Sequence, residues 1–324
     1  MRPYRIVLTR PPMPAAREKL EPYAEMKVWE GPGAIPRGLL LEWLQDADGL
    51  FSLGDVRVDE ELLSAAPRLK AISQSSVGYD NVDVEACTRR GIPFGNTPGV
   101  LVETTADLAF GLLLTAARRI HEGWEWVRSG QWREDASFPF GVDLYGKTLG
   151  IVGMGDIGSA VARRALASGM RVIYHNRARR SDEEALRTAY ADFGELLAAA
   201  DFIVVLVPLS AATQGMFGPA EFARMKPTAY FVNASRGKIV QTEALCDALR
   251  EGRIAYAALD VTDPEPLPAG HPLLTLPNVL ITPHIGSATR ETRTRMAELA
   301  ADNLIAGLHG RRLPACVNPQ VFGS

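Results

Sequence analysis

Three side chains of types that bind carboxylates and move protons stand in the C-terminal half of the chain. Arg236, Glu265 and His284 each follow an apolar segment by a few residues. A guanidinium can bind a carboxylate through two hydrogen bonds and polarise a nearby carbonyl oxygen. An imidazole can exchange a proton near neutral pH, and a carboxylate beside it can fix its tautomer and raise its basicity. Together these groups suit the interconversion of a 2-keto acid and a 2-hydroxy acid, with a coenzyme carrying the hydride.

A glycine-rich segment upstream is suited to bind such a coenzyme. Gly153, Gly155 and Gly158 form the pattern G-x-G-x-x-G between an apolar run and a helical one. The first glycine allows a tight turn, the second lets the backbone approach a pyrophosphate, and the third lets the helix pack on the strand. Free amides at the helix N-terminus would bind the pyrophosphate. We therefore expect a dinucleotide site, the alternative being a glycine-rich turn without a ligand.

The end of the next apolar segment indicates which dinucleotide is preferred. A site for NAD carries an acidic residue about 20 residues past the glycines, where it binds the ribose 2′-hydroxyl. Here the segment ends in Asn176 and Arg177, and the first carboxylate is that of Asp182. We expect Arg177, with Asn176 beside it, to bind a 2′-phosphate. NADP(H) is the predicted coenzyme and NAD(H) the alternative, whereas a merely basic, solvated turn would imply no preference.

The elements that must position these residues alternate between apolar strands and helices, which predicts parallel sheets. The strands expected around the glycine pattern and after it are residues 148–152, 171–175, 202–207, 229–233, 254–259 and 279–282. Such near-continuous apolar runs are typical of strands covered on both faces. Ligands bind beyond the carboxyl ends of parallel strands, so the catalytic candidates should share one edge of one sheet. One long helix is expected over residues 101–127, followed by a loop or arm at 131–145.

We predict an α/β fold with two parallel-sheet domains of Rossmann-like or flavodoxin-like type. A dinucleotide-binding domain at residues 100–285 is inserted into a split substrate domain made of residues 1–99 and 286–324. The length of 324 residues fits this division, since single cores stop growing near ~250–300 residues.

The composition excludes several classes of partner. The chain is 47% hydrophobic and 23% charged, as in globular proteins, and its formal net charge of −3 argues against nucleic acid as a partner. No apolar run approaches the ~20 residues that a membrane-spanning helix needs, so no membrane partner is expected. Cys87, Cys246 and Cys316 lack metal-ligand spacing and are expected to be reduced thiols in a cytoplasmic protein without a bound metal.

Several motifs resemble those of D-isomer-specific 2-hydroxyacid dehydrogenases, and the resemblance covers essentially the full length. The matching stretches are residues 76–83, 103–109, 148–158, 233–238, 259–266 and 283–289. Within this family the chain is most similar to glyoxylate/hydroxypyruvate reductases. The similarity is carried in particular by Pro264-Glu-Pro-Leu-Pro and His271-Pro-Leu-Leu-Thr-Leu.

The resemblance implies a function and a set of site residues. It implies reduction of a small 2-keto acid, glyoxylate or hydroxypyruvate, with Arg236, Glu265 and His284 as the catalytic set and His284 as proton donor. It implies that Val77 and Gly78 offer backbone amides to the substrate carboxylate, and that two copies form a homodimer through the coenzyme domains. Expected coenzyme contacts are Thr105, Gly153, Gly155, Asp156, Ile157, Gly158, Asn176, Arg177, Pro208, Ala234, Ser235, Arg236, Asp260, His284 and Gly286, with Asp260 at the nicotinamide or the substrate.

Other functions are compatible with the same residues. Where related reductases often carry a pocket tryptophan, this chain has Phe138 or Phe140, which leaves the substrate open. A 2-ketogluconate reductase, a D-lactate dehydrogenase and a short phosphoglycerate dehydrogenase are the enzymatic alternatives. A dinucleotide-sensing module of the corepressor kind is the alternative without catalysis, because fold alone does not determine function.

Overall fold

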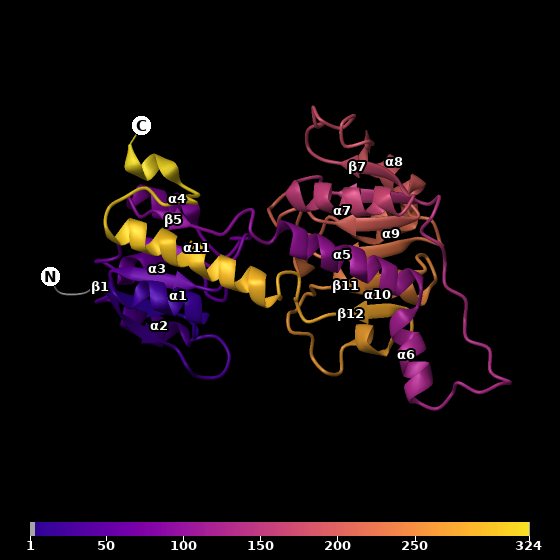
Figure 1. Cartoon of the computed structure of the whole chain (residues 1–324), viewed down its shortest axis with the longest axis horizontal. Coiled ribbons are helices and arrows are strands. Elements are labelled where there is room, and N and C mark those ends of the chain that lie inside the picture. The colour runs from indigo at the N-terminus through magenta and orange to yellow at the C-terminus, as the bar shows by residue number, and fades with distance from the viewer. Residues whose placement is uncertain (1–3, 324) are drawn as a thin grey trace. The chain divides into compact units, whose positions relative to one another are not determined.

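A computed structural model describes residues 4–323 and divides the chain into two compact units. Unit 1 comprises residues 1–101 and 287–324, and unit 2 comprises residues 102–286. The N-terminal and C-terminal segments, indigo and yellow in Figure 1, therefore belong to the same unit. Residues 1–3 and 324, which the sequence analysis includes in the substrate domain, lie outside the described residues.

Unit 1 is built on a five-stranded parallel sheet of order β2-β1-β3-β4-β5. Its strands are β1 (Tyr4–Leu8), β2 (Ala24–Val28), β3 (Gly49–Ser52), β4 (Ala71–Gln74) and β5 (Phe94–Gly95). Its α-helices are α1 (Pro14–Leu20), α2 (Arg37–Leu44), α3 (Glu60–Ala65), α4 (Val84–Arg89) and α11 (Arg290–Leu308). This strand order is that of flavodoxin-like sheets.

Alternating strand residues of unit 1 supply two cores on opposite faces of the sheet. Val7, Leu50 and Ile72 pack with α2, α3 and α4. Ile6 and Phe51 point to the other face and pack with α1 and α11. Because α11 covers one face of a sheet made by the first hundred residues, the C-terminal segment completes the N-terminal unit.

Unit 2 is built on a seven-stranded parallel sheet of order β12-β11-β10-β9-β6-β7-β8. Its strands are β6 (Thr148–Val152), β7 (Arg171–His175), β8 (Ala189–Tyr190), β9 (Phe202–Val205), β10 (Tyr230–Asn233), β11 (Tyr256–Leu259) and β12 (Val279–Ile281). Its α-helices are α5 (Val102–Ala117), α6 (Ile120–Arg128), α7 (Asp156–Ala167), α8 (Phe193–Ala199), α9 (Pro219–Arg224) and α10 (Thr242–Arg250). The strand order reverses between β6 and β9, as in a Rossmann sheet, and α5 and α7 pack on one face with α8, α9 and α10 on the other (Figure 1).

Adjacent strands of unit 2 end level with one another, and this register positions the site. Val152 pairs with Val205, which pairs with Asn233. Asn233 in turn pairs with Leu259, and Leu259 pairs with Ile281. The segments that follow these five residues therefore begin at the same edge of the sheet.

The prediction of one long helix over residues 101–127 is wrong. The structure has two helices, α5 and α6, separated at Arg119, whose φ of +52° lies in the left-handed region. An L-residue in this region redirects the chain and stops helical propagation. The apolar period continues across the break, so the sequence pattern did not reveal it.

Candidate active site

His284 and Glu265 form a hydrogen-bonded pair at the carboxyl edge of the unit 2 sheet. His284 Nδ1 lies 2.7 Å from Glu265 Oε1, and both side chains are partly exposed. Burial by itself would raise the pKa of Glu265, but the hydrogen bond and charge of His284, the amide of Thr262 and the charge of Arg236 lower it below its ordinary value. A proton on Nδ1 would be donated to this carboxylate. Nε2 is then the ring nitrogen that can exchange a proton with a substrate.

The backbone of His284 is held in the left-handed region by the residue that follows β11. The φ of His284 is +54°, and its amide donates to the carbonyl oxygen of Asp260 at 3.0 Å. Asp260 is 2% exposed, and its carboxylate accepts the amides of Ile285 and Gly286, each at 2.8 Å. A Cβ on Gly286 would stand 3.3 Å from Asp260 Oδ2 and 3.4 Å from a methyl carbon of Thr105. Thr105, Asp260 and Gly286, all expected coenzyme contacts, thus lie together.

Arg236 is carried by a turn that the last residue of β10 holds in place. The buried amide of Asn233 donates to the carbonyl oxygen of Arg236 at 3.0 Å and accepts the N–H of Ser235 at 3.1 Å. A Cβ on the next residue, Gly237, would overlap the carbonyl group of Thr262. The turn of Arg236 therefore packs directly against the loop that carries Glu265, so unit 2 brings together all three catalytic candidates.

The three glycines after β6 occupy different environments. Gly153 has a φ of +105°, and a Cβ there would stand 2.6 Å from the backbone nitrogen of Val207. A Cβ on Gly158 would overlap the carbonyl oxygen of Gly153, so this glycine allows α7 to pack on β6. A Cβ on Gly155 would meet nothing within 4 Å. The open space beside Gly155, at the N-terminus of α7 that begins with Asp156 and Ile157, fits the pyrophosphate of a dinucleotide.

The structure places one more cation beside the glycine loop than the sequence analysis expected. The side chain of Asn176 contacts this loop, and its Oδ1 accepts the amide of Met154 at 2.7 Å. Arg180 also donates to the carbonyl oxygen of Met154, at 2.8 Å, and forms a two-pronged ion pair with Asp182. Arg177 is exposed, and no hydrogen bond or ion pair is recorded for it within residues 4–323. Arg180 is therefore a further cation beside the glycine loop that the sequence analysis did not single out.

The other expected site residues lie on loops of their own units. In unit 2, Pro208 follows β9, and its carbonyl oxygen accepts the hydroxyl of Thr213 at 2.6 Å. In unit 1, Val77 and Gly78 follow β4, and their carbonyl oxygens accept side-chain N–H groups of Asn96 at 2.9 Å and Gln74 at 2.8 Å. These bonds hold the turn of Val77 and Gly78 in a defined shape.

The two phenylalanines of the arm differ from each other. Phe138 packs edge-to-face on Trp126 of α6, with ring centroids 5.6 Å apart. Phe140 is 94% exposed.

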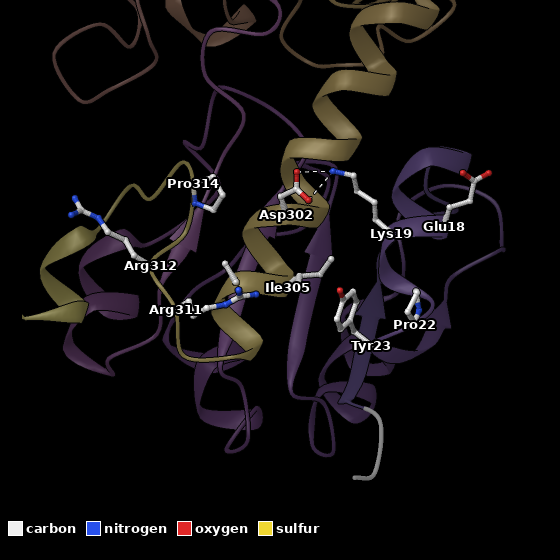
Figure 2. A pocket seen from close by; sticks show the side chains of 10 residues that line it. Glu18, Lys19, Pro22, Tyr23, Asp302, Ile305, Arg311, Arg312 and Pro314 are labelled. Atoms are coloured by element: carbon white, nitrogen blue, oxygen red, sulfur yellow. Dashed lines mark hydrogen bonds and ion pairs between the residues drawn. The ribbon is translucent and has the colours of Figure 1, made fainter.

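A surface hollow of about 610 Å³ lies in unit 1. Figure 2 shows it between α1 and the C-terminal end of α11, where Lys19 is paired with Asp302 at 2.7 Å. Its lining combines cations such as Arg311 with carboxylates and includes none of the expected site residues. We do not assign it to the active site.

Neither a membrane helix nor a metal cluster is found in the described part of the chain. None of the helices within residues 4–323 has both the length and the apolar character needed to cross a membrane. Over the same residues, His, Cys, Asp and Glu side chains form no group of three or more that could hold a metal ion.

Comparison with known proteins decides the family. Residues 110–286 match the model of the D-isomer specific 2-hydroxyacid dehydrogenase NAD binding domain. The chain belongs to the D-isomer-specific 2-hydroxyacid dehydrogenases. It is 47% identical over 320 residues to a glyoxylate reductase of Korarchaeum cryptofilum, covering 98% of this chain and 96% of the relative. It is 50% identical over 311 residues to a glyoxylate reductase of Thermococcus litoralis, covering 94% of each chain.

A solved structure places the same fold around a coenzyme. The NADPH-dependent glyoxylate/hydroxypyruvate reductase of Sinorhizobium meliloti, in complex with NADP and malonate, superposes with a TM-score of 0.89. The two sequences are 34% identical, and the match covers 98% of each chain. As a 2-hydroxyacid dehydrogenase, this chain is an NAD(P)-dependent oxidoreductase.

Two structural residues of the site escaped the sequence analysis. Asn233 holds the turn of Arg236, and Thr282 donates its hydroxyl to Asp260 Oδ1 at 2.6 Å. The available signal was a polar residue at the carboxyl end of an apolar strand, directly before a candidate catalytic loop. Such a residue needs a hydrogen-bond partner when buried, and the loop supplies it.

Proposed function

We propose that this protein reduces glyoxylate or hydroxypyruvate to the corresponding 2-hydroxy acid, with NADP(H) as preferred coenzyme. The observation that carries the proposal is the His284–Glu265 pair on the sheet edge that also carries Arg236 and the glycine loop. The glyoxylate reductases among the relatives, at 47% and 50% identity, support the substrate class.

Each catalytic candidate has a distinct role in this proposal. Arg236 binds the substrate carboxylate through two hydrogen bonds and polarises the keto oxygen. His284 donates a proton from Nε2 to that oxygen as the alcohol forms, and Glu265 accepts the hydrogen bond from Nδ1 and stabilises the charged ring. The bound nicotinamide supplies the hydride. The assignment of the Val77 and Gly78 amides to the substrate carboxylate rests on the family resemblance.

The preference for NADP(H) rests on the charges after β7. Arg179 and Arg180 each bind a carboxylate, Glu183 and Asp182 respectively, whereas Arg177 has no recorded partner within residues 4–323. A solvent-facing guanidinium that forms no ion pair within residues 4–323 favours a 2′-phosphate over a 2′-hydroxyl. NADH remains the alternative hydride donor.

The coenzyme proposal is tested with Arg177→Ala and a matched control, Arg179→Ala. A hydrogen bond to a charged group contributes ~1.5–3 kcal/mol, so Arg177→Ala should raise the NADPH KM roughly 10- to 100-fold and leave the NADH KM almost unchanged. Arg179→Ala should change neither KM by more than about twofold, because that guanidinium binds Glu183 at the surface. A wild-type kcat/KM higher with NADH than with NADPH would contradict the proposal.

The reaction itself is tested with a panel of keto acids. Initial rates with glyoxylate, hydroxypyruvate, pyruvate, 2-ketogluconate and 3-phosphohydroxypyruvate, each with NADPH and NADH, should give the highest kcat/KM with one of the first two. A higher value for another keto acid would assign the chain to a different dehydrogenase. Coenzyme binding without turnover of any keto acid would favour a dinucleotide-sensing module.

A homodimer and a cytoplasmic location complete the proposal. Trp124 on α6 is 61% exposed, and Trp132 and Phe140 on the following arm are 75% and 94% exposed. Aromatic side chains are enriched at protein interfaces. Light scattering after gel filtration should give about twice the chain mass of 35.2 kDa, and Trp124→Glu combined with Trp132→Glu should lower the measured mass toward that of one chain.

The proposed cytoplasmic location rests on the cysteines. The three free cysteines are consistent with a reducing compartment.

A further inference from the structure

His284 occupies a backbone conformation that few non-glycine residues adopt. Its φ of +54° is left-handed, and non-glycine residues persist there only when the surrounding structure imposes it. The position is preceded by Pro283 and followed by Ile285, neither of which favours a left-handed turn. One hydrogen bond within the turn supports this conformation, because the His284 amide donates to the carbonyl oxygen of Thr282 at 3.0 Å.

Asp260 supplies further hydrogen bonds from outside the turn. Its carbonyl oxygen accepts the His284 amide at 3.0 Å, and its carboxylate accepts the amides of Ile285 and Gly286 at 2.8 Å each. The same carboxylate accepts the hydroxyl of Thr282 at 2.6 Å. One 2%-exposed residue thus binds the chain on both sides of His284. Three of the roughly four acceptor positions of its carboxylate are used within the protein, which leaves about one for a coenzyme.

The Thr282 hydroxyl orients this carboxylate. Thr282 follows β12, where its amide donates to the carbonyl oxygen of Leu259 at 2.8 Å, so its own backbone is fixed by the sheet. Its hydroxyl and the Ile285 amide share Asp260 Oδ1, and this leaves Oδ2 directed to Gly286. Without the hydroxyl, the carboxylate can rotate away from one of the two amides, and the turn can relax out of the left-handed region.

We propose that Thr282, acting through Asp260, is a positioning residue that sets the orientation of the His284 imidazole. The inference rests on the proposed function, in which His284 exchanges the proton. A relaxed turn would move Nδ1 away from Glu265 Oε1, with which it now makes a 2.7 Å hydrogen bond. The ring would then lose both its fixed tautomer and its place beside the substrate oxygen, while the glycine loop that binds the coenzyme stays intact.

The first test compares Thr282→Val, which removes the hydroxyl, with Thr282→Ser, which keeps it. A misplacement of about 1 Å can cost ~10²-fold in rate, so Thr282→Val should lower kcat roughly 10- to 100-fold. Because Asp260 is itself an expected coenzyme contact, the coenzyme KM should also rise, but by a smaller factor than the loss of kcat. Thr282→Ser should recover most of kcat. Thr275→Val is the matched control, because the Thr275 hydroxyl donates to the carbonyl oxygen of Pro272 and not to Asp260. If Thr282→Val does not fold, Thr282→Ala removes the same hydroxyl without adding a methyl group.

A double-mutant cycle separates positioning from a general structural role. In a His284→Ala background, Thr282→Val should have no further effect on residual turnover, because the group that it positions is gone. An equal loss of kcat in both backgrounds would overturn the proposal. So would a Thr282→Val enzyme with kcat within twofold of wild type.

A measurement without substrate separates this inference from the proposed function. In protein labelled with ¹⁵N-histidine and free of ligands, the His284 resonances should report the Nδ1-protonated tautomer in wild type and in Thr282→Ser. In Thr282→Val they should report a mixture of tautomers. An unchanged tautomer would overturn the positioning role even if the enzyme reduces glyoxylate. Absence of turnover in wild type with the expected tautomer change would overturn only the function.

Discussion

Replacing Gly155 or Gly158 by alanine is expected to affect different properties of the protein, its coenzyme affinity and its stability respectively. An added Cβ at Gly155 meets nothing within 4 Å, and its φ of −85° suits any residue. At the N-cap of α7, alanine is poorer than glycine, so Gly155→Ala should cost at most about 1 kcal/mol of unfolding free energy. At Gly158 the Cβ would overlap the carbonyl oxygen of Gly153 and stand 3.3 Å from a methyl carbon of Ile151. This overpacking should cost about 1–3 kcal/mol or more, because backbone must move.

The effect on coenzyme affinity should run in the opposite order. The methyl group of Gly155→Ala enters the space that the pyrophosphate needs. If the pyrophosphate is displaced from one backbone amide, coenzyme binding loses ~1.5–3 kcal/mol. The Kd for NADPH should therefore rise roughly 10- to 150-fold. Gly158→Ala should weaken binding mainly through the lost fraction of folded protein, so the folded enzyme should keep more of its affinity than Gly155→Ala does.

The assay pairs thermal unfolding without coenzyme with calorimetric titration of NADPH. For a unit of this size, 1 kcal/mol corresponds to about 2–4 °C, so Gly158→Ala should lower Tm by roughly 2–12 °C and Gly155→Ala by at most about 4 °C. A Gly155→Ala protein that binds NADPH with the wild-type Kd would refute the assignment of this loop to the pyrophosphate. A Gly158→Ala protein with the wild-type Tm would refute the packing argument.

Three further substitutions test the remaining parts of the argument. His284→Ala should lower kcat ~10²–10⁴-fold with little effect on the Kd for NADPH, and a variant with more than half of wild-type turnover would exclude His284 as the proton donor. Arg236→Lys should raise the KM for the keto acid at least about tenfold, because an ammonium cannot make the planar two-pronged contact, and near-normal kinetics would show that Arg236 is not the substrate anchor. Asp201→Asn tests acid stability: burial by itself would raise the pKa of Asp201, but its hydrogen bonds with Lys226 and the amide of Thr148 hold that pKa below its ordinary value. The wild-type carboxylate therefore stabilises the fold above its unfolded-state pKa near ~4, and this stabilisation is lost as the pH falls through the lower folded-state value. Urea unfolding should show Asp201→Asn less stable by about 1–3 kcal/mol at pH 7 and by much less near pH 3, and an equal deficit at both pH values would contradict the assignment.

Much of the architecture could be predicted from local sequence patterns. The apolar runs that predicted strands in unit 2 correspond to β6, β7, β9, β10, β11 and β12. The expected strands of unit 2 do not include β8, which has two residues. Periodicity needs more residues than that to be distinguished from a loop. The break at Arg119 was missed because a left-handed residue leaves no mark on an apolar period.

The residues of the candidate site followed from the same local signals together with one topological rule. Parallel strands present their carboxyl ends at one edge, so Arg236, Glu265 and His284 could be assigned to that edge from their positions alone. The pairing of Glu265 with His284 was expected from the chemistry of a carboxylate beside an imidazole, but its geometry could not be predicted. Glu265 and His284 are 19 residues apart, and their contact depends on how two loops from neighbouring strands fold over the edge.

Only the tertiary structure decided how the His284 turn is held. The left-handed φ of His284, the three carboxylate hydrogen bonds of Asp260 and the packing of Gly237 on the Thr262 carbonyl group join residues from different strands. The same is true of α11, whose apolar face is buried against a sheet formed about 200 residues earlier. A sequence pattern reports the period and the turn chemistry of a single segment. Hydrogen bonds between segments depend on where the strand ends meet in space, and this is determined by the packing of the whole unit.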